Sequence, residues 1–471
     1  MNDEFLNIIL PDSWVWSKSK EIGLIINGDR GKNYPSRRHY VETGIPFITA
    51  GHLSDGKLSF NEMNYITESK FEALSSGKLL LGDIIYCLRG TLGKCAIYMV
   101  DKRAAIASSL TILRLNTFVN RKYVFYYLQS PFGKELVRKY DNGTAQPNLS
   151  AESFANYTIP IPPLPEQHHI VAKIEELFSS LDKGIENLKT AQQQLKVYRQ
   201  AVLKWAFEGK LTNRNVAEGE LPEGWRKVKL GEVIKTIDGD RGPNYPKKDE
   251  LIQKGYCLFL STKNVREDSF VFEDNIFISK EKDEILRGGK LQLSDVIITT
   301  RGTLGNVALY DEKIPYKHIR INSGMLILRR TNESLNNYYL MKFITSPIFI
   351  SQLKERQTGT AQQQIPANVL REIEIPLSHI PEQHAIVQEI ESRLSVCDKI
   401  EESIEHSLKQ SEALRQSILK KAFEGKLVPQ DPNDEPASVL LDRIKAEREK
   451  SKLETPPRRQ AGQIKAKKAK S

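Results

Sequence analysis

The chain has 471 residues, which is long for one domain core, so we expect at least two. A composition of 39% hydrophobic and 27% charged residues is that of a folded globular protein and excludes wholesale disorder. The sequence has no apolar run approaching about 18 residues and no basic-then-apolar start, so we expect neither a membrane helix nor a secretion signal. A cytoplasmic protein is therefore predicted. The four cysteines are too widely spaced for a Cys-x-x-Cys metal site and are expected to be free, buried thiols: Cys87, Cys95, Cys257 and Cys397.

Lysine and arginine exceed aspartate and glutamate by 69 minus 59, a formal net charge of +10 that favours a polyanionic partner. Much of this excess lies at the end of the chain, where residues 443–471 hold 11 basic residues against three glutamates. The body is thus close to neutral and would need a locally basic face to bind DNA. The tail after Thr455 has the composition of a disordered segment that attracts nucleic acid.

The first region, residues 1–165, is rich in glycine, tyrosine, isoleucine and threonine, and its short apolar runs are broken by turn signals. The runs 79–86 and 96–98, for example, flank the Gly-containing turn 89–93. This pattern predicts a mixed α/β domain with a strand-rich core. Short helices are expected at 123–128 and, later in the chain, at 337–344.

A long helix is predicted next, within residues 166–212. The stretch from Glu166 to Phe207 has no proline and one glycine, Gly184. Its apolar residues recur in steps of three, four and seven, which is typical of a coiled-coil seam. Pro165 suits the first turn of such a helix and Gly209 its end. A helix of this kind cannot bury its apolar stripe alone.

The second half of the chain repeats the first. Six motifs return in the same order, at an offset that drifts from 211 to 216 residues: Leu-Pro-x-x-Trp, Gly-Asp-Arg-Gly-x-Asn-Tyr-Pro, Arg-Gly-Thr-Leu-Gly, Gly-Thr-Ala-Gln, Pro-Glu-Gln-His and Ala-Phe-Glu-Gly-Lys-Leu. We therefore expect a second domain, a second long helix and a C-terminal extension with a basic, disordered tail: residues 213–380, 381–427 and 428–471. If the two helices form an antiparallel coiled coil, the repeat acquires a pseudo-two-fold axis that matches related, inverted half-sites on duplex DNA.

The Gly-Asp-Arg-Gly-x-Asn-Tyr-Pro loop is the strongest candidate for DNA contact. Arginine can donate two hydrogen bonds to guanine, asparagine can pair with adenine, and tyrosine can stack or bind a phosphate. The alternative is a structural turn in which Asp29 pairs with Arg30. The candidates from this loop are Arg30, Lys32, Asn33, Tyr34, Arg241, Asn244 and Tyr245.

Three further segments offer polar side chains at matched positions of the two copies. A neighbouring segment differs between the copies and would distinguish the half-sites, whereas the two glycine-containing turns could equally be structural. The candidates from these segments are His52, Arg89, Thr91, Thr144, Gln146, Lys263, Asn264, Arg301, Thr303, Thr360 and Gln362.

The motifs that usually mark catalysis are missing. The sequence contains no glycine-rich phosphate loop, no Asn/Asp-Pro-Pro-aromatic segment and no His-Glu-x-x-His pair. The His168-His169 pair has only His384 opposite it in the repeat, which favours a solvated helix face over a metal site. We therefore predict no catalytic and no metal-binding residues.

The duplicated motif order resembles the specificity subunit of type I restriction–modification systems over residues 10–445. The resemblance implies two target recognition domains that each read half of a split DNA site, and two spacer helices that set the gap between the halves. It also implies two modification (methyltransferase) subunits and restriction (endonuclease and translocase) subunits as partners. S-adenosylmethionine, ATP and Mg²⁺ would then belong to those partners, and this chain would hold no cofactor. A DNA-bridging scaffold, or a nuclease or methyltransferase with an unrecognised motif, remains the alternative.

Overall fold

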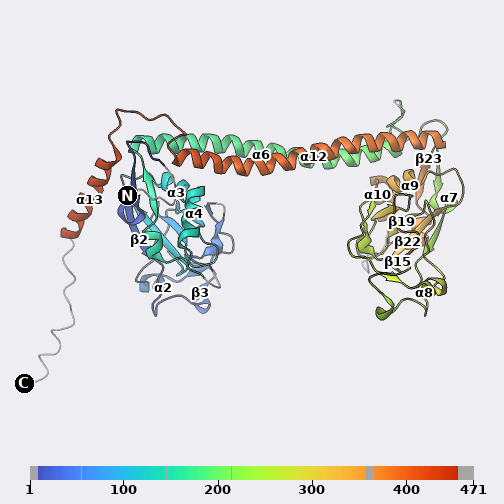
Figure 1. Ribbon diagram of the computed structural model, residues 1–471, viewed down its shortest axis with the longest axis horizontal. Helices are drawn as coiled ribbons and strands as arrows, with labels where there is room; N and C mark the ends of the chain where they lie inside the picture. Colours follow the sequence, from blue (N-terminus) through green and yellow to red (C-terminus); the bar gives the residue numbers. More distant parts are fainter. Residues whose placement is uncertain (1–8, 55, 144–146, 214, 357–363, 455–471) are drawn as a thin grey trace, which may run out of the picture. The chain divides into compact units, whose positions relative to one another are not determined.

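The computed structural model describes residues 9–54, 56–143, 147–213, 215–356 and 364–454 (Figure 1). Four candidate residues, Thr144, Gln146, Thr360 and Gln362, lie outside these ranges, as does the tail 455–471. The chain divides into two compact units, which we call unit 1 (Met1–Glu186 with Leu408–Ser471) and unit 2 (Asn187–Ser407). Each unit therefore joins one globular domain to one half of each long helix.

The domain of unit 1 is built on two four-stranded sheets. The first, antiparallel sheet has the order β2-β11-β8-β9: Gly23–Asn27, Leu110–Leu115, Ile84–Cys87 and Cys95–Ile97. The second has the order β10-β4-β7-β3, with β10 and β4 parallel: Ala105–Ile106, Ile45–Ile48, Tyr65–Ile66 and Tyr40–Val41. Two strand pairs complete the domain: β1–β12 (Val15–Lys18 and Thr158–Ile161) and β5–β6 (Leu53–Ser54 and Lys57–Leu58). Its short helices are α1 to α5 and η1 and η2: Ser19–Ile22, Glu68–Ala73, Arg121–Gln129, Pro131–Tyr140, Ala151–Ala155, Arg37–His39 and Ala50–His52.

The domain of unit 2 repeats this architecture. Its antiparallel sheet has the order β14-β22-β19-β20: Ile234–Asp238, Met325–Arg330, Val296–Thr299 and Val307–Leu309. The second sheet has three strands, β18-β15-β21: Phe277–Ile278, Cys257–Leu260 and Ile319–Ile321. The strand pairs are β13–β23 (Arg226–Lys229 and Glu374–Leu377) and β16–β17 (Val265–Arg266 and Ser269–Phe270). The short helices are α7 to α11 and η3 and η4: Leu230–Val233, Lys280–Ile285, Asn337–Ile344, Pro347–Arg356, Ala367–Arg371, Lys248–Glu250 and Thr262–Asn264.

The central sheet of each domain is covered on both faces. All four residues of β8 are buried, and they alternate between two apolar clusters: Ile84 and Tyr86 pack toward α3, Ile85 and Cys87 toward the second sheet. A strand buried on both faces has a continuous apolar sequence, which explains why Ile84–Cys87 shows no alternation. Leu80 and Leu81, which the apolar run 79–86 also includes, precede the strand and are exposed. The predicted helices at 123–128 and 337–344 are confirmed as α3 and α9. The side chains of Asn120 and Asn336 cap them.

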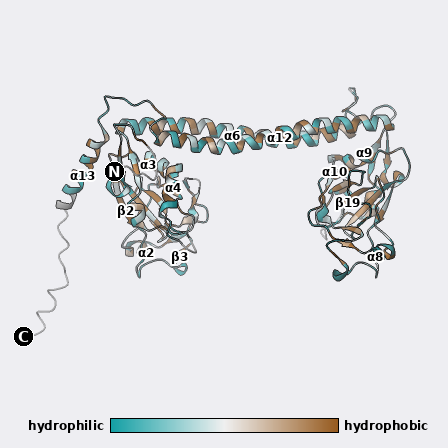
Figure 2. Ribbon diagram, viewed as in Figure 1, coloured by the Kyte–Doolittle hydropathy of each residue, from teal (hydrophilic) through white to brown (hydrophobic). Residues whose placement is uncertain are grey.

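The two long helices are α6 (Leu164–Phe207) and α12 (Ile380–Phe423), each of 44 residues. Brown apolar and teal polar residues alternate along both, as the seam pattern predicts (Figure 2). In unit 1 the first half of α6 packs on the last half of α12, and in unit 2 the last half of α6 packs on the first half of α12. The pair is therefore antiparallel. Both helices end before a glycine with positive φ, Gly209 (75°) and Gly425 (71°), as expected of a C-terminal stop.

The chain after α12 returns to unit 1. Helix α13 (Ala437–Glu454) buries Leu440 and Ile444 in the core of that unit, and the backbone N–H of Ala437 donates to Ser13 O at 3.0 Å. All four cysteines are free and buried, as predicted. Among the described residues, no helix is both long enough and apolar enough to cross a membrane.

Candidate nucleic-acid interface

Two of the repeated motifs fasten each domain to the start of its long helix. Trp14 Nε1 donates to Glu166 Oε2 at 2.9 Å, and Trp225 Nε1 donates to Glu382 Oε2 at the same distance. The Gln167 side chain then bridges two loops, because its Oε1 accepts from the backbone N–H of Asn120 and its Nε2 donates to Pro162 O. Gln383 repeats both roles. The Leu-Pro-x-x-Trp and Pro-Glu-Gln-His motifs are therefore structural.

The end of the other long helix completes each junction. In unit 1, the Phe423 ring of α12 lies 5.2 Å from the Tyr123 ring and 5.1 Å from that of Tyr127, in edge-on contacts. In unit 2, the Phe207 ring of α6 takes the same place, against Tyr339 (4.9 Å) and Phe343 (5.2 Å). Aromatic contacts of this geometry add to the burial of the rings. Each domain is thus held by the start of one helix and the end of the other.

The histidines of the Pro-Glu-Gln-His motif belong to the same junction. The His168 ring Nδ1 lies 3.0 Å from Asn120 Nδ2, and His384 faces Asn336 in the same way. Among the residues that the structure describes, no group of three or more His, Cys, Asp and Glu side chains could hold a metal ion.

The loop after the first strand of each central sheet is held by its aspartate. Asp29 Oδ1 accepts from the Gly31 N–H at 2.7 Å, and its Oδ2 accepts from the N–H and hydroxyl of Ser75. These bonds lower the pKa of Asp29, that from Gly31 most. Asp240 plays the same part, accepting from the N–H groups of Gly242 and Arg287, which lower its pKa. The aspartate therefore caps its own loop and does not pair with the arginine beside it.

The arginines of these loops are exposed. Arg30 donates only a long bond, 3.4 Å, to Ser108 O, and Arg241 donates an equivalent bond to Ser323 O and a 2.9 Å bond to Asp238. Lys32 is also exposed.

The rest of the loop anchors it to the fold. Asn33 Nδ2 donates to Ala73 O at 2.8 Å, and the ring of Tyr34 packs edge-on against Phe47 at 5.8 Å. Tyr245 packs on Phe259 in the same way, at 5.7 Å, and Asn244 is half-buried. The arginine is therefore the side chain of the motif that is best placed to reach a ligand.

His52 and Asn264, both candidates for contacts with bases, have side chains that are turned into the fold. They are 6% and 2% exposed. His52 Nδ1 accepts from the Thr49 N–H, while Asn264 Oδ1 accepts from the Ser261 N–H and its Nδ2 donates to Val271 O. In both units this side chain closes a single turn of 3-10 helix. Lys263, on the same turn, is exposed.

The Arg-Gly-Thr-Leu-Gly turns need their glycines for backbone reasons. Gly90 and Gly93 have φ of 86° and 80°, a region that other residues rarely adopt, and the glycines of the second copy repeat this. The arginine and threonine side chains of these turns are exposed: Arg89, Thr91, Arg301 and Thr303. Arg89 Nε donates to Asn148 Oδ1 at 3.1 Å.

A short turn that sequence analysis missed joins the Gly-Asp-Arg-Gly-x-Asn-Tyr-Pro loop to the Arg-Gly-Thr-Leu-Gly turn in each unit. In unit 1, Arg30 donates to Ser108 O while the N–H of Leu88, next to Arg89, donates to Ser109 O. In unit 2, Arg241 donates to Ser323 O while the N–H of Arg301 donates to Gly324 O. We call these two loops with the turn between them the loop cluster of each unit. Nothing in the residue types of the turn (Ser-Ser and Ser-Gly) signals this role.

Two similar units, each with exposed arginines on a loop cluster and a domain fastened to shared long helices, define a duplicated recognition protein. The comparisons agree. The model of the type I restriction modification DNA specificity domain matches twice, at residues 11–196 and 222–410. The chain therefore belongs to this family and is the DNA specificity subunit, the non-catalytic component, of a type I restriction–modification system.

Curated relatives match over nearly the whole chain. The EcoKI specificity subunit of Escherichia coli strain K12 is 24% identical over 93% of this chain and 96% of its own length. The EcoBI specificity subunit of Escherichia coli is 27% identical over 93% of each chain. The crystal structure of the HsdS subunit from Thermoanaerobacter tengcongensis has the same fold, with a TM-score of 0.59 and 22% identity over 89% of this chain and 99% of that one.

Proposed function

We propose that each unit reads one half of a bipartite DNA target through its loop cluster. The observation that carries the proposal is the pair of exposed arginines on the loop cluster of each unit, Arg30 and Arg89 in unit 1 and Arg241 and Arg301 in unit 2. A guanidinium forks onto the O6 and N7 edge of guanine. Lys32, Thr91 and Thr303 lie on the same turns, and Lys263 lies on the 3-10 turn Thr262–Asn264; all four would contact phosphates or bases at the rim. Thr144, Gln146, Thr360 and Gln362 stay candidates from sequence alone.

The partners are expected to supply the chemistry. Two modification subunits, which use S-adenosylmethionine, would dock on the long helices and methylate the target in the cytoplasm. Restriction subunits, which use ATP and Mg²⁺, would cleave DNA that is not methylated. The solved structure of a type I system described for its complex assembly has this fold, with a TM-score of 0.68.

The test is methylome sequencing of a host that carries the complete system, because the methylated motif is the target. Arg30→Ala should relax one position of one half-site, since a lost bidentate contact costs about 1–3 kcal/mol of discrimination. Arg443→Ala is the matched control, because it removes an exposed arginine of the same unit on α13. If the Arg30→Ala variant instead methylates all sequences with equally reduced efficiency, Arg30 contacts a phosphate and does not read a base.

The long helices are proposed to set the spacer between the half-sites. Inserting one heptad into each, after Leu188 and after Ile404, keeps the seam in register and adds about 10 Å. The methylated motif should then gain about three base pairs of spacer, at about 3.4 Å per pair, with both half-sites unchanged. An unaltered spacer would contradict this role.

A further inference from the structure

The loop clusters of the two units differ in where an unpaired guanidinium lies. The strand before the loop ends in Asn27 in unit 1 and in Asp238 at the matched position of unit 2. Asp238 Oδ1 accepts from Arg241 Nη2 at 2.9 Å, and both side chains are about half exposed. Arg30 has no such carboxylate partner among the described residues. The carboxylate pairs with Arg241 and holds its guanidinium toward the strand, so this exposed ion pair competes with a contact to DNA.

Unit 2 carries a second arginine at this place. Ser75 in unit 1 and Arg287 in unit 2 occupy the same position, since each donates its backbone N–H to the aspartate of its loop, at 2.7 and 2.8 Å. The Ser75 hydroxyl turns inward and donates to Asp29 at 2.8 Å. The Arg287 side chain is exposed and lies across the loop: a Cβ added at Gly242 would be 3.0 Å from its Nη2.

Arg287 lacks an ion pair of the kind that Arg241 forms with Asp238. Among the described residues, Arg287 forms no ion pair. Its charge does act on nearby Asp240 and helps to lower the pKa of that carboxyl group, whose oxygens accept the backbone N–H groups of Gly242 and Arg287. Because Gly242 has no side chain, the Arg287 guanidinium can lie over the loop, where it stays exposed. Lys32, the other exposed cation of the unit 1 loop, is replaced by Pro243 in unit 2. In unit 2, the exposed cation without an ion pair is thus Arg287, in the segment after α8 (Lys280–Ile285).

We propose that Arg287 is a specificity-determining residue of unit 2, and that its guanidinium takes the base contact that Arg30 makes in unit 1. The inference rests on the proposed function of the loop clusters. It assigns the second half-site to a residue outside the repeated motif. The half-sites should therefore differ at this position, because the two guanidinium groups start from different segments of the fold.

The experiment is methylome sequencing with the complete system and the variants Arg287→Ala, Arg287→Lys, Arg241→Ala and Arg30→Ala. Arg287→Ala should reduce discrimination at one position of the second half-site by about tenfold or more and leave the first half-site unchanged. Arg287→Lys should relax the same position, because an ammonium keeps the charge but lacks the fork. Both variants keep the backbone bond to Asp240, and an unchanged thermal unfolding curve would show that the fold is intact.

A rescue variant tests the exchange directly. Asp238→Asn combined with Arg287→Ser gives unit 2 the residues of unit 1 and frees Arg241, so discrimination should return, although the preferred base can change. The proposal is overturned if Arg287→Ala leaves the motif unaltered while Arg241→Ala relaxes it, or if Arg287→Lys behaves as the parent protein, which is the result expected of a phosphate contact. If no variant, Arg30→Ala included, changes the motif, the loop-cluster function fails as well; if only Arg30→Ala does, this inference alone fails.

Discussion

In unit 1 and unit 2, the same types of side chain fasten the domain to the long helices, but some of the residues buried inside the two domains differ. The junction contacts of Trp14, Gln167 and Phe423 recur at Trp225, Gln383 and Phe207 with nearly the same distances. The domains differ in buried residues that have changed together. Side chains that contact each other must be compatible in volume and charge, so a change in one constrains its neighbour.

The clearest coupled change lies between the second sheet and the short helix beside it. In unit 1, Phe71 is buried against β10, whose Ala105 leaves room for it, and the Lys78 ammonium lies 4.8 Å from the ring centre. In unit 2 the matched residues are Asp283, Arg320 and Lys290. Asp283 is 1% exposed and accepts from Arg320 Nε and from Lys290 Nζ, each at 2.5 Å. Burial acts to raise the pKa of Asp283, but the bonds from Lys290 and Arg320 outweigh it and lower the pKa.

The largest expected effect comes from breaking this ion pair. Arg320→Ala should destabilise unit 2 by about 3–5 kcal/mol, because it leaves a buried carboxylate without its main partner. Asp283→Phe combined with Arg320→Ala restores the apolar pair of unit 1 and should recover most of the loss. Native-state hydrogen exchange of β15 and β21 measures the effect within unit 2. A single variant that costs under about 1 kcal/mol would show that the ion pair is not needed.

A smaller effect on stability is expected from a change of pH that titrates Glu166, and this effect should be confined to unit 1. Glu166 is 2% exposed, and burial raises its pKa to about 7, although the hydrogen bond from Trp14 opposes the shift. Its Oε1 has no hydrogen-bond partner in the described structure, whereas Glu382 Oε1 accepts from Thr212 and Asn213. The folded state favours the protonated form of Glu166. The stability that this group contributes to unit 1 is therefore fully present below its unfolded pKa of about 4.5, and it is lost as the pH rises through about 7.

Unit 1 should therefore lose on the order of 2–3 kcal/mol between pH 4.5 and pH 8 through Glu166. Glu166→Gln should flatten this dependence, since an amide mimics the neutral carboxyl group. Glu382→Gln is the control and should leave the pH dependence of unit 1 unchanged. Hydrogen exchange of α3 and α13 at several pH values measures it, and a slope that survives in Glu166→Gln would assign the effect to another group.

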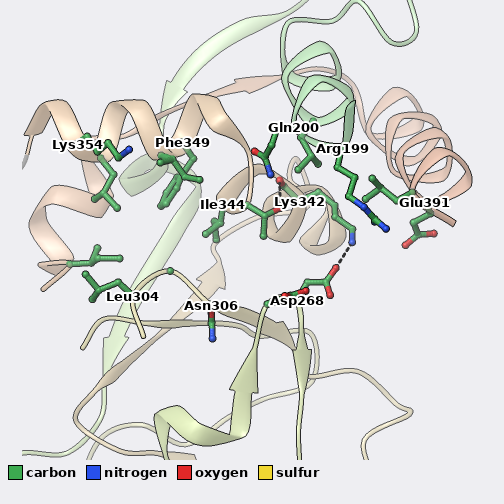
Figure 3. Close-up of a pocket in the computed structure, with 18 of the residues that line it drawn as sticks. Arg199, Gln200, Asp268, Leu304, Asn306, Lys342, Ile344, Phe349, Lys354 and Glu391 are labelled. Atoms are coloured by element: carbon green, nitrogen blue, oxygen red, sulfur yellow. Dashed lines mark hydrogen bonds and ion pairs between the residues drawn. The ribbon is translucent and has the colours of Figure 1, made fainter. Parts of the chain in front are cut away.

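The smallest effect concerns a pocket of about 830 Å³ in unit 2 (Figure 3). It is lined by residues of α6, α9, α10 and α12, and Lys342 on its wall donates to Asp268 at 2.7 Å. The positions of unit 1 that match Lys342 and Leu394 hold Tyr126 and Phe178. Those two rings pack edge-on at 5.8 Å, and the Arg415 guanidinium lies 4.4 Å from the Phe178 ring centre. Larger side chains thus occupy the matched place in unit 1.

Leu394→Phe should fill part of this pocket and stabilise unit 2 by up to about 1 kcal/mol, the value of one or two buried methylene groups. Val396→Phe, at an exposed position of the same helix, is the control and should give no gain. Urea unfolding of the two variants compares them, and a loss of stability in Leu394→Phe would mean that the pocket is too constrained to accept the ring.

The sequence by itself determined the duplication, the two long antiparallel helices and the family, because these depend on period and motif order. It also located the Arg-Gly-Thr-Leu-Gly turns, since glycine with positive φ is a local requirement of the backbone. The tertiary structure decided which side chains of those loops are available. Asp29 bonds to backbone N–H groups rather than to Arg30, and His52 and Asn264 point inward. Local bonds start these arrangements, from Gly31 to Asp29, from Thr49 to His52 and from Ser261 to Asn264. The remaining oxygen of Asp29 and the amide nitrogen of Asn264 find their partners, Ser75 and Val271, only in the folded chain. It also decided that Phe423 completes the core of the first domain, some 300 residues away along the chain, because burial depends on which segments the whole fold brings together.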